Sequence, residues 1–209
     1  MVEIIPGILE KEANNLRYRL LKASILTNRA HIDVIDENFA PNKTLYPKEW
    51  PEIPLGLEIG AHLMVNNPLS WINECLRFGA QNVIGQIEAI DDQVEFVKVV
   101  AANGGKAGLA LDLSTPVSRL NPETFSQLSF AVLMSVRAGY SGQVFNAEVL
   151  PKIKALREIV GNNAEIIVDG GITPDTARVC LEWGVQSLVV NSYLWENPEN
   201  NFHKLQALA

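Results

Sequence analysis

The sequence predicts one α/β domain over residues 1–209 with the (β/α)8 TIM-barrel fold, and three observations predict it. Eight short apolar segments alternate with helical patterns from one end of the chain to the other. The length of 209 residues is within the range that such barrels reach as one unit. No change in composition marks a linker, and no Gly-x-Gly-x-x-Gly follows the first apolar segment, which disfavours a doubly wound sheet.

The eight apolar segments are the predicted strands. Many of them are rich in valine and isoleucine, as expected for parallel strands that are buried on both faces. In chain order they are residues 2–8, 31–35, 57–65, 82–87, 107–111, 130–136, 165–168 and 186–190. The first of them begins close to Met1, without the basic start and long apolar core of a signal peptide.

Helical patterns between the strands complete the predicted units. They cover residues 10–26, 68–78, 91–102, 146–160 and 174–183. Asn67 and Thr173, each followed by proline, are the predicted N-caps of two helices, and Gly79 and Gly184 are predicted to end them. Two crossovers, residues 46–54 and 116–122, contain too many prolines for more than a short helix.

Composition and charge exclude several classes of partner. The formal net charge is −7, and the 17 basic residues form no cluster, which argues against nucleic acid and anionic membranes as partners. The apolar runs are strand-sized, so no transmembrane helix is expected. Cys75 and Cys180 are isolated, and we expect them to pack as small apolar side chains in a reducing, cytoplasmic compartment.

Three short motifs end predicted strands and together offer two imidazoles and two carboxylates. His31 and Asp33 lie in the second strand, His62 in the third, and Asp169 directly after the seventh. Taken alone, each histidine is more often a hydrogen-bonded core residue than a metal ligand, and each aspartate is more often a cap or a carboxylate that orders a loop. Together they form the ligand set of a divalent metal site, because four unpaired polar groups in a barrel mouth are costly to desolvate.

Glycine-rich turns follow the sixth and seventh strands, and two small polar residues follow the eighth. Gly139-Tyr140-Ser141-Gly142 follows the sixth, Gly170-Gly171 the seventh and Asn191-Ser192 the eighth. Each pair of glycines alone is explained by a tight turn, but these loops are the usual phosphate site of the fold. Their convergence therefore favours a phosphorylated ligand.

In order along the chain, these motifs resemble the ribulose-phosphate 3-epimerase family. The resemblance rests on residues 31–36, 39–42, 62–65, 134–136, 139–143 and 168–172, and runs from about Ile5 to Leu194. It implies a barrel of the ribulose-phosphate-binding type that interconverts D-ribulose 5-phosphate and D-xylulose 5-phosphate, a reaction of the pentose phosphate pathway. It also makes a homo-oligomer plausible.

The resemblance also implies roles for individual residues. His31, Asp33, His62 and Asp169 would bind one divalent ion, with Zn²⁺ as first choice and Fe²⁺, Mn²⁺ or Co²⁺ as alternatives. Asp33 and Asp169 would be the acid/base pair. The remaining substrate and phosphate contacts would come from Met64, Met134, Gly139, Tyr140, Ser141, Gly142, Gly170, Gly171, Asn191 and Ser192. The two methionines are equally compatible with core packing.

Several residues depart from the family pattern. Gly7 replaces a serine, Gln86 a histidine and Asn191 a glycine, while Asp112 and Arg137 replace asparagines. The predicted metal and proton-transfer residues are complete, but the residues around the substrate are altered. Two alternatives to the pentulose-phosphate epimerase therefore stay open. One is an epimerase or isomerase of another phosphorylated ketose, and the other is a barrel that binds a phosphosugar without turnover.

Overall fold

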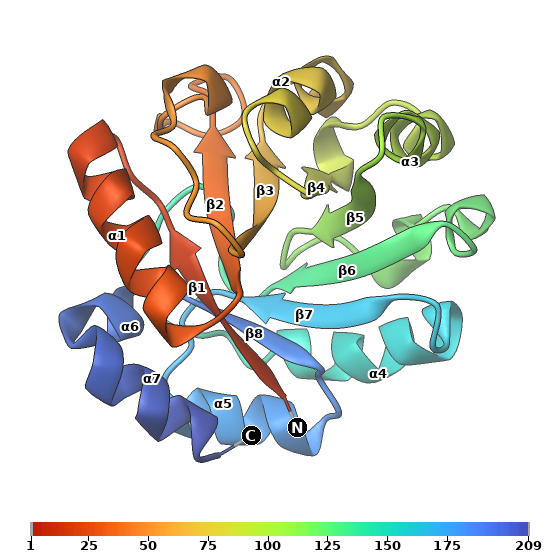
Figure 1. Ribbon diagram of the computed structural model, residues 1–209. Coiled ribbons are helices and arrows are strands. Elements are labelled where there is room, and N and C mark those ends of the chain that lie inside the picture. Colours follow the sequence, from red (N-terminus) through yellow and green to blue (C-terminus); the bar gives the residue numbers. More distant parts are fainter. Residues whose placement is uncertain (1, 209) are drawn as a thin grey trace.

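The computed structural model describes residues 2–208 and confirms the TIM barrel. Eight parallel strands close into a ring in chain order, because the last strand pairs with the first. The helices lie around the outside of this ring (Figure 1). The strands are β1 Glu3–Ile8, β2 Arg29–Ile35, β3 Glu58–Met64, β4 Asn82–Gln86, β5 Lys106–Leu111, β6 Leu128–Met134, β7 Glu165–Asp169 and β8 Ser187–Val190.

The α-helices follow the predicted order, and short 3₁₀ turns occupy the proline-rich crossovers. The α-helices are α1 Ala13–Leu26, α2 Ile72–Arg77, α3 Gln93–Ala102, α4 Val149–Val160, α5 Pro174–Glu182, α6 Ser192–Glu196 and α7 Pro198–Gln206. The 3₁₀ turns are η1 Pro47–Glu49, η2 Pro68–Trp71, η3 Ile87–Ala89, η4 Val117–Arg119 and η5 Pro122–Thr124. Within residues 2–208, no helix has the length and hydropathy that crossing a bilayer requires.

Both predicted N-cap positions are confirmed, but only one of the two side chains caps its helix. Thr173 accepts a hydrogen bond from the backbone N–H of Thr176, whose side chain accepts one from the N–H of Thr173. Asn67 is the N-cap residue before Pro68, but its side chain makes no capping hydrogen bond. Its φ of 52° is left-handed, whereas a capping side chain needs an extended backbone. The following segment therefore opens as the 3₁₀ turn η2 and becomes α-helical only at Ile72.

The carboxyl-terminal helices α6 and α7 were not predicted, because α6 has only five residues and the sequence of α7 is mostly polar. In α7 only Asn201, Phe202 and Leu205 are buried. The two predicted cysteine environments are confirmed, since Cys75 and Cys180 are both buried and unpaired. Burial raises the pKa of each thiol to about 12.

Side chains of the strands alternate between two separate cores. On β2, Ala30, Ile32 and Val34 face the helices and belong to the outer core. Ile35 belongs to the inner core within the barrel. Because successive strand residues point to opposite faces, His31 and Asp33 share the inner face with Ile35. The predicted orientation of the β2 histidine and aspartate is thus confirmed.

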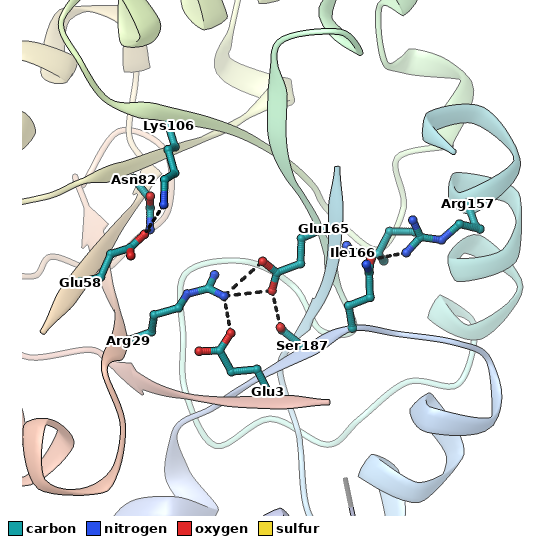
Figure 2. A network of polar contacts seen from close by, with 10 residues as sticks. Glu3, Arg29, Glu58, Asn82, Lys106, Arg157, Glu165, Ile166 and Ser187 are labelled. Carbon is teal, nitrogen blue, oxygen red and sulfur yellow. Dashed lines mark hydrogen bonds and ion pairs between the residues drawn. The ribbon is translucent and has the colours of Figure 1, made fainter. Parts of the chain in front are cut away.

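Polar residues at the amino-terminal end of the barrel form two hydrogen-bonded networks, together called the polar ring below (Figure 2). Arg29 donates to both carboxylate oxygens of Glu165 at 3.1 Å and also pairs with Glu3. Glu58 accepts from Asn82 at 2.9 Å and from Lys106 at 3.0 Å. The members of the ring are the first residues of seven strands, namely Glu3, Arg29, Glu58, Asn82, Lys106, Glu165 and Ser187. The ring therefore joins the beginnings of strands that are distant in sequence.

We expect Arg29→Met to lower the free energy of unfolding by about 1–3 kcal/mol, the usual cost of leaving hydrogen-bonding groups without their partner. The Arg29 side chain is 15% exposed, and the carboxylates of Glu3 and Glu165, 34% and 23% exposed, would lose their shared partner with water only partly able to replace it. Urea unfolding measures the loss. Lys106→Met is the matched control, because Lys106 is 57% exposed and its pair is expected to contribute under about 1 kcal/mol. Equal losses in both variants would contradict this explanation.

Candidate functional site

Two imidazoles and two carboxylates meet inside the mouth of the barrel. His31 and Asp33 come from β2, His62 from β3 and Asp169 from the end of β7. All four side chains are buried. One nitrogen or oxygen atom from each of them lies within 4.8 Å of the corresponding atoms of the other three. The four residues singled out in the sequence as metal ligands therefore form one cluster, called the His/Asp cluster below.

The strand register sets the geometry of the His/Asp cluster. Asp33 is the β-sheet partner of His62, and both point into the barrel. Asp33 Oδ1 lies 3.3 Å from His31 Nε2 and 3.2 Å from His62 Nδ1. Asp169 Oδ2 lies 3.7 Å and 3.8 Å from the same two nitrogens. Each carboxylate thus faces both imidazoles across a small central space.

The atoms around this central space fit a divalent metal ion. Among residues 2–208, His31 Nε2, Asp33 Oδ1 and His62 Nδ1 are buried and make no hydrogen bond. An unsatisfied buried polar atom costs about 1–3 kcal/mol, and more for a charged one. A cation at this place would satisfy all three atoms at once. Imidazole nitrogens with carboxylate oxygens are a donor set that Zn²⁺ and other first-row metals accept.

The two aspartates have opposite electrostatic environments. Burial alone would raise the pKa of Asp33, but the close imidazoles of His31 and His62, 3.3 Å and 3.2 Å away, outweigh it and lower that pKa to about 2. Burial raises the pKa of Asp169, and the nearby charge of Asp33 raises it further, to about 7. In the metal-free protein one carboxyl group is therefore ionised, while the other holds a proton up to neutral pH.

The two histidines differ in the same way. Burial lowers the pKa of His31, but Asp33 and Asp169 outweigh this and the net pKa is raised. At His62 burial dominates and the pKa is lowered, with the positive charge of His31 adding to the effect. The metal-free His/Asp cluster thus favours one charged and one neutral imidazole.

Hydroxyl groups that the sequence did not single out hold the backbone beside both aspartates. Thr44 donates to the carbonyl oxygen of Asp33 at 2.8 Å and accepts from the N–H of Ile35 at 2.9 Å. Ser135 donates to the carbonyl oxygen of Asp169 at 3.1 Å. Both hydroxyls are buried. The signal for them is weak in a sequence, because Thr44 lies in an irregular loop eleven residues after Asp33.

A pocket opens directly above the two aspartates. The predicted substrate residues all line it, together with five residues that the sequence analysis missed. The predicted ones are Met64, Met134, Gly139, Tyr140, Ser141, Gly142, Gly170, Gly171, Asn191 and Ser192, and the added ones are Leu9, Val136, Gln143, Ile172 and Val189. His31 and His62 lie below the pocket and do not line it.

Two glycines let the loops around the pocket pack closely. A Cβ atom on Gly171, whose φ is +60°, would lie 2.4 Å from the backbone nitrogen of Phe145. A Cβ atom on Gly139, whose φ is +112°, would lie 2.6 Å from Ala40. The loop after β6 therefore packs against the loops after β2 and β7. Tyr140 strengthens the contact, since its hydroxyl donates to the carbonyl oxygen of Pro41 at 2.6 Å.

Residues that depart from the family pattern lie both inside and outside this pocket. Asn191 lines the pocket, and its Oδ1 accepts from Arg19 at 3.2 Å. A Cβ atom on Gly7 would lie 3.3 Å from the Cβ of Asn191, so the two positions are in contact. Arg137 and Asp112 instead line a separate groove, and Arg137 is exposed. An exposed Arg137 outside the pocket fits a solvated side chain better than a phosphate contact.

The fold and the site define a class, a TIM barrel with a candidate divalent metal centre at the carboxyl ends of its strands. Solved structures show the same fold at low identity. KGPDC from Streptococcus mutans has a TM-score of 0.71 and 13% identity, with 99% of this chain and 96% of that chain covered. The tryptophan synthase A-subunit from Pyrococcus furiosus has a TM-score of 0.66 and 15% identity, covering 99% and 97%.

The family follows from sequence comparison. The model of the Ribulose-phosphate 3 epimerase family matches residues 3–195, and the chain belongs to this family. Ribulose-phosphate 3-epimerase from Mycobacterium tuberculosis is 34% identical over 172 residues, which cover 79% of this chain and 74% of that protein. The enzyme of the same name from Candida glabrata is 30% identical over 210 residues, covering 90% and 84%.

Proposed function

We propose that this protein is a metal-dependent epimerase that interconverts D-ribulose 5-phosphate and D-xylulose 5-phosphate. One observation carries the proposal: two carboxylates and two imidazoles converge below a pocket whose walls include the glycine-rich loops after β6 and β7. Membership of the Ribulose-phosphate 3 epimerase family supports it.

The proposed reaction needs two bases. The C3 proton beside the ketone is removed on one face of the sugar, and a proton is returned on the other face through an enediolate. Asp33 and Asp169 both line the pocket and come from strands on different sides of it, so we assign them these roles. A positioned carboxylate of this kind contributes roughly 10²- to 10⁴-fold to the rate.

The His/Asp cluster would hold the metal ion through His31, Asp33, His62 and Asp169. When bound, a divalent ion supplies Lewis-acid stabilisation of the negative charge that develops on the sugar oxygens. The protein contributes the arrangement of its four ligands, which the β2, β3 and β7 backbones hold in register. The electrostatic effect is large because the ligands are buried away from water.

Apolar and glycine-rich walls of the pocket would hold the rest of the substrate. Met64 and Met134 belong to the inner core and also line the pocket, so they pack the barrel and would exclude water from the enediolate. Gly139, Gly170 and Gly171 line the pocket together with Ser141 and Ser192. Backbone N–H groups in such loops are the usual phosphate ligands of the fold.

Deuterium incorporation tests the proposal. Zn²⁺-loaded protein in D₂O is expected to convert ribulose 5-phosphate to xylulose 5-phosphate with one solvent deuterium at C3. Proton NMR of the sugar follows both events, and protein treated with a chelator is the control. If the metal-loaded protein neither converts ribulose 5-phosphate nor exchanges its C3 proton, this substrate assignment is wrong.

One observation favours a second candidate, a 3-epimerase of another phosphorylated ketose. Asn191 places an amide side chain in the pocket, where the family pattern has glycine, and Arg19 holds that amide in place. Gly7, which touches Asn191, lacks the hydroxyl of the family's serine. The same deuterium assay on a panel of hexulose phosphates separates the candidates. Exchange at C3 of a hexulose phosphate, without exchange in ribulose 5-phosphate, selects the second.

A further inference from the structure

Gln86 lies against one of the histidines of the His/Asp cluster. It is the last residue of β4, the strand that pairs with β3, and its side chain is fully buried. Its Nε2 atom lies 3.1 Å from Nε2 of His62. Within residues 2–208, no group hydrogen-bonds to the buried Oε1 atom of Gln86. The amide therefore has one end on the imidazole and the other end unsatisfied.

The chemistry of the imidazole determines which end of the amide belongs there. His62 turns Nδ1 toward Asp33 and Asp169, so Nδ1 is the nitrogen available to a metal ion. A metal ligand needs a lone pair on that nitrogen, which places the ring proton on Nε2. A buried Nε2–H group then needs an acceptor. The amide nitrogen of Gln86 cannot accept, but its oxygen can.

A half turn of the Gln86 amide about its last bond exchanges the two ends without changing the shape of the side chain. Oε1 then lies against His62 Nε2 and accepts a hydrogen bond from the Nε2–H group. The two unsatisfied features of this corner, the orphaned Oε1 and the Nε2–H of a metal-binding His62, satisfy each other. We propose that Gln86 is a positioning residue that holds His62 in the Nε2–H tautomer and so presents Nδ1 to the metal ion.

The choice of glutamine has a physical consequence. The family pattern has a histidine here, whose own tautomer and charge change with pH, whereas an amide does not titrate. Gln86 accepts from Nε2–H when metal is bound, and its NH₂ group can donate to Nε2 when His62 carries its proton on Nδ1. Metal binding thus selects one of two amide orientations. The inference rests on the proposed metal-dependent function.

Zinc affinity tests the inference independently of turnover. We expect Gln86→Leu to weaken Zn²⁺ binding by about 10- to 100-fold, the usual cost of removing the hydrogen-bond partner of a metal-binding histidine. Gln86→Glu, which keeps an acceptor, should retain wild-type affinity. Gln81→Leu is the matched control, since Gln81 also bonds to β3, accepting from Ile59 N at the opposite end. Competition with a chromophoric chelator measures all four affinities.

The tautomer can be observed directly in the unaltered protein. Long-range ¹H–¹⁵N spectra of Zn²⁺-loaded wild type are expected to show the proton of His62 on Nε2. A proton on Nδ1 of His62 in the wild type would overturn the inference, and this result does not depend on how well the variant folds. Wild-type Zn²⁺ affinity in Gln86→Leu would overturn it as well. The proposed function fails separately: protein that shows the Nε2–H tautomer with bound Zn²⁺ but turns over no ketose phosphate would lose only its activity assignment.

Discussion

Replacing Asp33 or Asp169 by asparagine is expected to reduce epimerisation of ribulose 5-phosphate by about 10²- to 10⁴-fold. An amide cannot carry the C3 proton, and it is a poorer metal ligand than a carboxylate. The asparagine fills the same volume, so the barrel should stay folded. Initial rates measured at saturating Zn²⁺ quantify the loss for each variant.

The two aspartate variants should also differ from each other in isotope exchange. If the bases act on opposite faces, each variant keeps one base and exchanges deuterium into only one of the two epimers. Asp112→Asn is the control, because Asp112 directly follows β5, does not line the pocket, and accepts a hydrogen bond from Leu113 N through its Oδ1. Activity within a few-fold of wild type in either Asp33→Asn or Asp169→Asn would contradict the two-base assignment.

The metal-free protein is expected to lose stability as the pH rises from about 4 to 7. The pKa of Asp169 is raised from 3.8 to about 7, so over this range the folded state binds a proton that the unfolded state has released. Stability therefore falls as pH rises. At 1.36 kcal/mol per pH unit, the Asp169 contribution is about 4 kcal/mol. Urea unfolding in the presence of a chelator, repeated across this pH range, measures it.

Asp33 and His62 also make the stability of the metal-free protein depend on pH, but in a different pH range or in the opposite direction from Asp169. The lowered pKa of Asp33 supplies stability above pH 3.8 that is lost on acidification toward pH 2. The lowered pKa of His62 makes stability rise with pH below 6.5, which opposes Asp169. Asp169→Asn removes the Asp169 contribution together with the part that Asp169 adds to the raised pKa of His31. The difference between wild type and this variant should thus change by several kcal/mol from pH 4 to 7, and a constant difference would refute the expectation.

Much of the fold follows from local patterns. Apolar runs of four to nine residues with helical stretches between them predict the alternation, and strand periodicity predicts that His31 and Asp33 share a face with Ile35. Parallel strands then place His62 and Asp169 at the same end of the barrel. These predictions succeed because they need only two things: the alternation of side chains along one strand, and the parallel arrangement of all strands in the barrel.

The features that the sequence did not predict depend on contacts between distant residues. Arg19 meets Asn191 across 172 positions, and Gln86 meets His62 across 24. The residues next to Arg19 or Gln86 in the sequence do not indicate that either side chain contacts Asn191 or His62. Asn67 is the N-cap residue as predicted, but its sequence pattern does not show that its backbone is left-handed and that its side chain makes no capping hydrogen bond. Helix α7 shows too few apolar residues to be recognised.

The inward-facing polar side chains of strand β2 belong to two different groups, the polar ring at the amino-terminal end of the barrel and the His/Asp cluster at its mouth. Arg29, His31, Asp33 and Ile35 form one column of side chains along the inner face of this strand, so the polar ring and the His/Asp cluster share one strand. Deleting or inserting one residue in this strand would turn the whole column outward. The length of β2 is therefore more constrained than its composition. Changes of substrate would then arise in the loops and at positions such as Asn191, where side chains can vary without moving this column.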